Sequence, residues 1–133
     1  MGREIKVIIG KEKYTTTINI EPHQIIADEP TDLGGQDLGP DPLELLLSSL
    51  GACKAMTVRM YADRKEWALE SVEIALSVGE QKSEHQETTF INCHIKFIGD
   101  LDDKQRQRLL MIADRCPIHK KLSNPIVIAS NLI

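Results

Sequence analysis

The longest apolar pattern in this chain runs from Pro42 to Lys65, with the sequence PLELLLSSLGACKAMTVRMYADRK. Its apolar residues fall on nearly every side of a helix, which is typical of a helix that is covered all round. Asp41 suits the N-cap, Pro42 the first helical position and Glu44 the third, so the pattern also predicts where the helix begins. We therefore expect one helix of about seven turns, with Cys53 near its middle.

Alternating apolar and polar residues predict strands on both sides of this helix. Before it, three short runs would form an antiparallel meander, and after it two longer runs would form a hairpin with a polar connection. The predicted strands are residues 4–9, 14–20, 23–28, 70–79 and 88–98, and the connection is residues 80–87. Residues 29–41 are rich in glycine, proline and acidic residues, and they predict a loop.

Shorter elements follow the hairpin. Residues 102–115 predict a second helix that is broken at Cys116 and Pro117, and residues 117–122 predict a helical turn that begins at this proline. Residues 126–130, IVIAS, predict a last strand. The order of these elements indicates a single α+β domain over residues 1–133, with a curved antiparallel sheet around the long central helix.

The long helix also predicts a second copy of the chain. A helix over residues 42–65 is ~36 Å long, which exceeds the diameter of a compact fold of this size. One sheet and one short helix would cover about half of its apolar surface. The simplest arrangement is therefore a homodimer in which two long helices share one core.

The charge and the N-terminal residues exclude several classes of protein. The net charge of −4 argues against a nucleic-acid-binding surface. The first residues, MGREIKVIIGKEK, mix charge into their apolar run and do not form a signal peptide. No uninterrupted apolar stretch is long enough to span a membrane. We expect a cytoplasmic protein that binds neither nucleic acid nor membrane.

The three cysteines stand in different surroundings, and their number does not indicate a disulfide framework. Cys93 shares the apolar face of its strand with Ile91 and Ile95, which predicts a buried core residue. Cys53 is either another core residue or a reactive thiol. Cys116 is predicted to be the N-cap of a helical turn, where free amide groups stabilise a thiolate and lower its pKa.

Positive residues add to the setting of Cys116: Arg115, His119 and Lys120 are its neighbours in sequence. His119 is interpreted either as a solvated helix-end residue or as a group that tunes the thiol. Cys116 and His119 have the spacing of half a zinc site, but no second ligand pair with suitable spacing exists, so we predict no metal. Cys53 and Cys116 would suit dithiol redox chemistry if the fold brings their Cα atoms within ~7 Å.

Two segments carry a resemblance to a known family: GPDPLELLLSSLGACKAMTVRMYADRK and IADRCPIHKKLSNPI. With the order of elements around them, they resemble the OsmC/Ohr family of small hydroperoxide-reducing proteins, and its OsmC-like branch in particular. The resemblance covers essentially the whole chain. It implies an intertwined α+β homodimer with two active sites at the subunit interface.

The resemblance also implies roles for the cysteines. Cys53 would attack the peroxide, and Cys116 would resolve the oxidised thiol. Substrates in the family are organic and fatty-acid hydroperoxides and hydrogen peroxide. The reductant is a dithiol such as a lipoylated protein, and neither a metal nor an organic cofactor is needed.

The chain departs from the active members of the family at two places. Those members carry a glutamate directly after the proline that begins the helix, where this chain has Leu43. Glu44 lies about 180° around the helix from Cys53 and ~13 Å along it. The active members also carry an arginine before the loop, and residues 26–30 contain none.

Other groups on the long helix were considered as supports for Cys53. Ser49 and Thr57 lie one turn to either side of it on nearly the same face, and their hydroxyl groups could donate hydrogen bonds to the thiol. Lys54 and Arg59 are predicted to lie on other sides of the helix.

The sequence thus predicts thiol-dependent reduction of hydroperoxides by the pair Cys53 and Cys116, in a stress or detoxification role. One alternative is a non-catalytic protein that binds an apolar small molecule at the dimer interface, in a cavity beside Cys53, Met56 and Met60. A third hypothesis is another thiol-dependent reaction on a different substrate.

Overall fold

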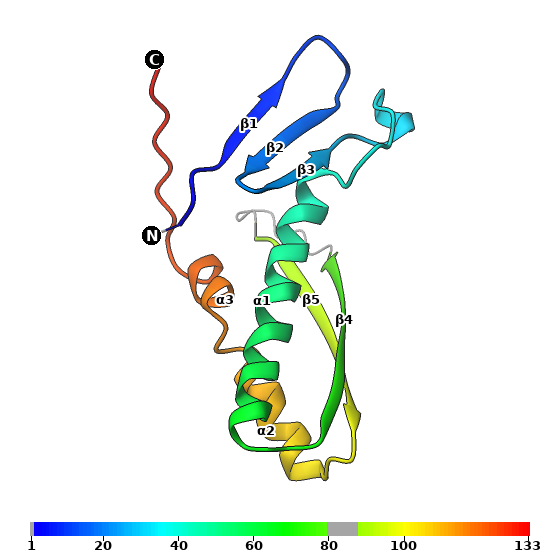
Figure 1. The fold of residues 1–133 in the computed structure, drawn as a ribbon, viewed down its shortest axis with the longest axis vertical. Helices are drawn as coiled ribbons and strands as arrows, with labels where there is room; N and C mark the ends of the chain where they lie inside the picture. The colour runs from blue at the N-terminus through cyan, green and yellow to red at the C-terminus, as the bar shows by residue number, and fades with distance from the viewer. Residues whose placement is uncertain (1, 80–87) are drawn as a thin grey trace. The chain divides into compact units, whose positions relative to one another are not determined.

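The computed structural model describes residues 2–79 and 88–133 of the chain. It has the predicted α+β composition, with antiparallel sheets and one long helix (Figure 1). The elements in chain order are β1 (Lys6–Ile9), β2 (Thr16–Ile20), β3 (His23–Ala27), the short 3-10 helix η1 (Thr31–Leu33), α1 (Pro42–Arg64), β4 (Leu69–Gly79), β5 (Phe90–Gly99), α2 (Asp103–Ala113) and α3 (Pro117–Leu122). The chain forms two compact units, residues 1–46 and 47–133.

The first unit contains the predicted meander. Strands β1, β2 and β3 pair in that order and antiparallel, so that Val7 lies opposite Ile18 and Ile18 opposite Ile25. The strand β1 is exposed along its whole length, although its sequence, KVII, is largely apolar. This exposed apolar strand becomes relevant to the oligomeric state below.

A buried carboxylate, Asp28, organises the loop after β3. Its side chain accepts backbone hydrogen bonds from Tyr14 at 3.1 Å, Glu29 at 2.8 Å and Leu38 at 3.2 Å. Burial raises the pKa of the Asp28 carboxyl, but the backbone N–H donors together hold that pKa below its usual value. The carboxylate therefore connects β2, β3 and the loop that leads to α1.

The start of α1 confirms the predicted cap. The Glu44 N–H donates to the Asp41 carboxylate at 2.8 Å, and the Asp41 N–H donates to the Glu44 carboxylate at 2.9 Å. This reciprocal capping box satisfies two backbone donors that a helix N-terminus otherwise leaves unpaired. The helix then continues to Arg64, close to the predicted end.

The second unit is built on the hairpin of β4 and β5. The two strands pair antiparallel along almost their whole length, with Ile74 opposite Ile95 and Leu76 opposite Cys93. Figure 1 shows α1 running along this hairpin, with α2 beside its C-terminal turns. The core between them contains the buried residues Val58, Ala62, Leu69, Phe97, Leu109, Ile112 and Ala113. The Cα of Gly51 approaches β4 so closely that an added Cβ would lie 2.7 Å from Leu76 Cδ1.

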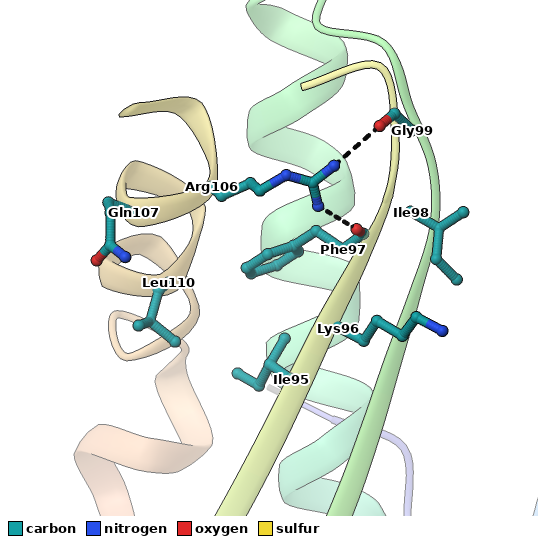
Figure 2. Close-up of a pocket in the computed structure, with 8 residues that line it drawn as sticks. All are labelled: Ile95, Lys96, Phe97, Ile98, Gly99, Arg106, Gln107 and Leu110. Carbon is teal, nitrogen blue, oxygen red and sulfur yellow. Dashed lines mark hydrogen bonds between the residues drawn. The ribbon is translucent and has the colours of Figure 1, made fainter. Parts of the chain in front are cut away.

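An arginine on α2 fixes the end of this hairpin. The Arg106 guanidinium donates to the backbone carbonyls of Phe97 and Gly99, the latter at 3.0 Å (Figure 2). It also donates to the carbonyl of Leu101 at 3.3 Å. A reciprocal capping box between Asp102 and Gln105 begins α2. Together these contacts set where α2, and hence the segment after it, lies on the hairpin.

The structure contradicts one prediction, and another concerns residues that the structure does not describe. The predicted last strand over residues 126–130 is wrong, since residues 124–133 have no regular secondary structure. Ile126, Val127 and Ile128 are strongly exposed, and within residues 2–79 and 88–133 no strand pairs with them to take up their backbone hydrogen bonds. The predicted connection at residues 80–87 lies outside the described residues.

Candidate active site

The fold brings Cys116 next to Cys53. Cys116 is the predicted N-cap of α3: it has an extended backbone, and its Sγ accepts the His119 N–H at 3.3 Å. Its side chain is completely buried, whereas Cys53 in the middle of α1 is half-buried. The Cys53 side chain is a hydrogen-bonding neighbour of the Cys116 thiol, and both cysteines are free. The structure therefore contains two adjacent thiols from distant parts of the chain.

The pKa of Cys116 does not shift in the direction predicted from sequence. Burial raises this pKa, and the His119 N–H lowers it in part. The Cys53 sulfur raises it further, both by hydrogen bonding to the protonated thiol and by its charge, while the charge of Lys54 lowers it. The result is a raised pKa, because removal from water outweighs one amide donor at a short helix. Burial therefore favours the protonated form of Cys116.

Lys54, which follows Cys53 on α1, contacts the segment that carries Cys116. It is almost completely buried, with 1% of the residue exposed. Its Nζ donates to the backbone carbonyl of Ala113 at 3.2 Å and to the Asp114 carboxylate at 3.0 Å, and it lies 2.7 Å from His119 Nδ1. Lys54 lies on another side of α1 from Cys53, as predicted, but its long side chain follows the buried face of α1 to the α2–α3 turn and so reaches the site.

A signal for this placement was present in the sequence. Leu50, Lys54, Val58 and Ala62 are spaced four residues apart and therefore share one face of α1. All four are buried. A lysine inside an otherwise apolar i, i+4 series indicates a buried cation, and it predicts a polar partner on the facing element.

His119 contacts this site through both its backbone and its ring. Its ring nitrogen Nδ1 lies 2.7 Å from Lys54 Nζ, and an ammonium group, which has donors only, requires this nitrogen to be the acceptor. The Asp114 carboxylate is 3.6 Å from the same ring nitrogen. His119 thus belongs to a cluster with Lys54 and Asp114 directly beside Cys116.

Of the two hydroxyl groups predicted to support Cys53, that of Thr57 lies differently from the prediction. Thr57 Oγ1 donates to the backbone carbonyl of Cys53 at 2.7 Å, so its proton is used on the helix backbone and not on the thiol. Ser49 is exposed one turn before Cys53. Cys93 is half-buried on β5 and faces a cavity.

This cavity, of about 400 Å³, shares Lys54, Asp114 and His119 with the polar cluster. Its other lining residues are mainly apolar: Leu50, Thr89, Ile91, Cys93, Leu122 and Ser123. A molecule with an apolar part and one polar end fits such a lining.

Two further cavities lie away from the cysteine pair. One of about 610 Å³ lies between β5 and α2, and its arginine, Arg106, already donates to backbone carbonyls (Figure 2). Another, of about 340 Å³, is lined by Met56 and Met60 but not by Cys53. Among the described residues, neither is lined by a cysteine, whereas the cavity beside Lys54 is lined by Cys93 but not by Cys53 or Cys116.

The described part of the chain contains neither a metal-binding cluster nor a membrane-spanning helix. No three His, Cys, Asp or Glu side chains in residues 2–79 and 88–133 are grouped so that they could hold a metal ion. Among the helices of the same residues, none has the length and apolar character needed to cross a membrane.

The fold and the site define a class: an α+β protein with two adjacent free thiols, one on a long helix and one capping a short helix. Comparison with known families gives the second step. The model of the family described as OsmC-like protein matches residues 34–131, and the chain belongs to this family.

Solved structures share the fold of this chain. An OsmC-like protein from Mycoplasma pneumoniae is 20% identical with a TM-score of 0.75, and the match covers 92% of this chain and 88% of the other. A putative osmotic stress induced and detoxification response protein from Psychrobacter arcticus is 22% identical with a TM-score of 0.74, over 91% and 89% of the two chains. An organic hydroperoxide resistance protein from Elizabethkingia anophelis is 17% identical with a TM-score of 0.67, over 91% and 89%. Comparison with curated protein sequences gives no match.

Proposed function

We propose that this protein reduces organic hydroperoxides or hydrogen peroxide with Cys53 and Cys116 as a dithiol pair. The observation that carries the proposal is the contact between the half-buried Cys53 and the buried Cys116. Some proteins with the same fold are named organic hydroperoxide resistance proteins, which agrees with this chemistry. A nearby cavity lined by Leu50, Ile91 and Lys54 would suit a hydroperoxide with an apolar part, although Cys53 and Cys116 are not among its lining residues.

The reaction assigns a different role to each sulfur. The Cys53 thiolate attacks the terminal oxygen of the hydroperoxide, so that an S–O bond forms, the O–O bond breaks, and the alkoxide leaves and takes up a proton as an alcohol. Cys116 then attacks the sulfenic sulfur of Cys53; the S–S bond forms, and the hydroxyl group leaves with the Cys116 proton as water. An external dithiol, such as a lipoylated protein, reduces this disulfide and becomes oxidised itself.

Burial supports this order of events. Cys53 is the more accessible sulfur, so a hydroperoxide reaches it first. Cys116 is completely buried and its pKa is raised, so it remains a thiol until the sulfenic acid forms beside it. The three free cysteines agree with a reducing compartment, and we place the protein in the cytoplasm.

The test is a count of thiols after treatment with one equivalent of cumene hydroperoxide or hydrogen peroxide. We expect the wild-type protein to lose two of its three thiols and to give a Cys53–Cys116 disulfide on peptide mapping. Cys116→Ser should stop at a sulfenic acid on Cys53 that dimedone traps, and Cys53→Ser should not consume peroxide.

Cys93→Ser is the control for the pairing, because Cys93 lies outside the pair; the variant should lose both of its thiols and form the same Cys53–Cys116 disulfide. Three titratable thiols after peroxide treatment would refute the redox proposal. In that case, binding of an apolar fluorescent probe that is lost on Leu50→Lys substitution would favour the non-catalytic alternative.

We also propose that the protein is a homodimer. Apolar side chains are exposed on β1, where Val7 is 61% exposed, and on α1, where Met56 and Met60 are 59% and 63% exposed. Exposed apolar groups on successive turns are typical of an interface, and a second copy of the chain would cover them. Sedimentation at micromolar concentration should give a dimer, and Met60→Glu should weaken it. Arg64→Glu, one turn further along α1, should leave the dimer intact; a monomeric wild-type protein would contradict the proposal.

A further inference from the structure

Lys54 presents a buried positive charge that the proposed reaction has not yet used. An ammonium group removed from water costs free energy unless its donors are satisfied. Each of the three N–H donors of Lys54 has an acceptor: the Ala113 carbonyl, the Asp114 carboxylate and the His119 ring nitrogen. The chain therefore keeps a buried cation at this position and provides a complete set of partners for it.

All three partners belong to the segment that carries Cys116. Ala113 is the last residue of α2, Asp114 follows it, and His119 lies in the first turn of α3. Cys116 stands between them, and Lys54 directly follows Cys53 on α1. The Lys54 side chain thus binds residues on both sides of Cys116 in the sequence and links them to the turn of α1 that carries Cys53.

The position of the charge favours one step of the reaction over the other. Charged and titratable groups near Cys116 come from three elements: Cys53 and Lys54 on α1, Asp114 and Arg115 after α2, and His119 on α3. Of these, Lys54 is the buried cation, whereas Asp114 and Arg115 are exposed, so that water screens their charges. Burial and Cys53 raise the pKa of the Cys116 thiol, and the charge of Lys54 opposes them.

We infer that Lys54 is a positioning residue for the second step, in which its anchored ammonium group holds Cys116 against Cys53 and stabilises the Cys116 sulfur as it gives up its proton. This inference rests on the proposed function. The electron pair of the Cys116 sulfur forms the S–S bond, the hydroxyl group of the sulfenic acid leaves, and the released proton completes water. Lys54 donates no proton in this step, and its hydrogen bonds remain in place.

The first experiment measures the ionisation of Cys116 without any peroxide. Cysteine labelled at Cβ with ¹³C is titrated in a Cys53→Ser/Cys93→Ser background, where Cys116 is the remaining thiol. Lys54→Gln keeps a hydrogen-bonding side chain but removes the charge, and it should reduce the thiolate fraction of Cys116 at a given pH about tenfold. Lys54→Arg should stay within about twofold of the reference protein.

Lys121→Met is the matched control, because it removes an exposed lysine from the same short helix α3. It should leave the titration of Cys116 unchanged. An unchanged titration in folded Lys54→Gln would overturn the inference. Lys54→Met, which fills the same space with an apolar chain, serves as a second variant if Lys54→Gln does not fold.

The second experiment follows the two steps of the reaction separately in otherwise wild-type protein. Rapid mixing with peroxide and quenching with dimedone should show sulfenic acid forming within about twofold of the normal rate in Lys54→Gln. The disulfide should form about tenfold more slowly, so that the sulfenic acid accumulates. Disulfide formation at the wild-type rate would overturn the role of Lys54. A wild-type protein that forms no sulfenic acid would instead refute the proposed function, and the titration would still decide whether Lys54 controls Cys116.

Discussion

The contact between α1 and β4 at Gly51 predicts whether a Gly51→Ala substitution raises or lowers the free energy of unfolding. Replacing Gly51 by alanine would place a Cβ 2.7 Å from Leu76 Cδ1, more than half an ångström inside the usual carbon–carbon separation of ~3.5–4.0 Å. Alanine in the middle of a helix is favoured over glycine by ~0.5–1 kcal/mol. The helix propensity and the packing therefore act in opposite directions at this position.

The packing cost decides the outcome. Inserting a methyl group into a filled contact costs about 1–3 kcal/mol when the neighbours must move. Leu76 is half-buried, and its end can rotate, so we expect a value in the middle of this range. The net effect of Gly51→Ala is then a loss of about 1 kcal/mol in the free energy of unfolding.

A double-mutant cycle with Leu76→Ala isolates the contact. Leu76→Ala alone should cost about 1–2 kcal/mol, less than for a fully buried leucine. In the double variant the clash is gone and the new methyl group fills part of the space, so the two losses should not add. Urea unfolding followed by circular dichroism, at one fixed protein concentration, gives the four free energies. Additive losses, or a Gly51→Ala protein more stable than wild type, would refute the close approach of α1 to β4.

Three other positions give shorter predictions. Gly99 has a φ of 148°, and a Cβ at this position would lie 2.0 Å from the Ala68 carbonyl oxygen. Gly99→Ala should therefore lower the free energy of unfolding by about 3 kcal/mol or more, and thermal unfolding should show a strongly lowered melting temperature. Arg106→Lys replaces a fork that donates to three carbonyls by a single ammonium group, and urea unfolding should show a loss of about 1–3 kcal/mol. The pKa of Asp28 is lowered in the folded protein, so its contribution to stability is complete above the ordinary aspartate range and is lost as the pH falls through the lowered value. The Asp28→Asn variant should therefore be less stable than wild type at neutral pH, and its urea midpoint should fall less than that of wild type as the pH drops below about 4. Equal changes of the urea midpoint with pH in the two proteins would contradict this role.

Features that depend on neighbouring residues in the sequence could be predicted well. The cap of α1 needs only Asp41 and Glu44, which lie three residues apart and bond each other. The meander and the hairpin follow from alternation and turns. The predicted strand over residues 126–130 is wrong, because a short apolar run forms a strand only where a neighbouring strand offers hydrogen bonds, and the run itself does not identify that neighbour.

The site was harder to predict because its properties come from tertiary burial. The cap position of Cys116 was correct, but the direction of its pKa shift was not, since burial of the thiol is decided by α1 and not by α3. Lys54, the next residue after Cys53, supplies a cation to the site, although the helical projection correctly predicts it on another side of the helix from Cys53. Its long side chain reaches the α2–α3 turn, which a helical projection drawn at Cβ does not show.

The three acceptors around Lys54 have a consequence for how this sequence can change over evolution. Lys54 shares one hydrogen-bonding cluster with Asp114 and His119, although about 60 positions of the chain separate them. A neutral residue at position 54 would leave the carboxylate and the ring without their shared donor, and a replacement at position 114 would leave a buried ammonium group without its counter-charge. Substitutions at these positions are therefore epistatic, and in the descent of this protein positions 54, 114 and 119 are expected to change together.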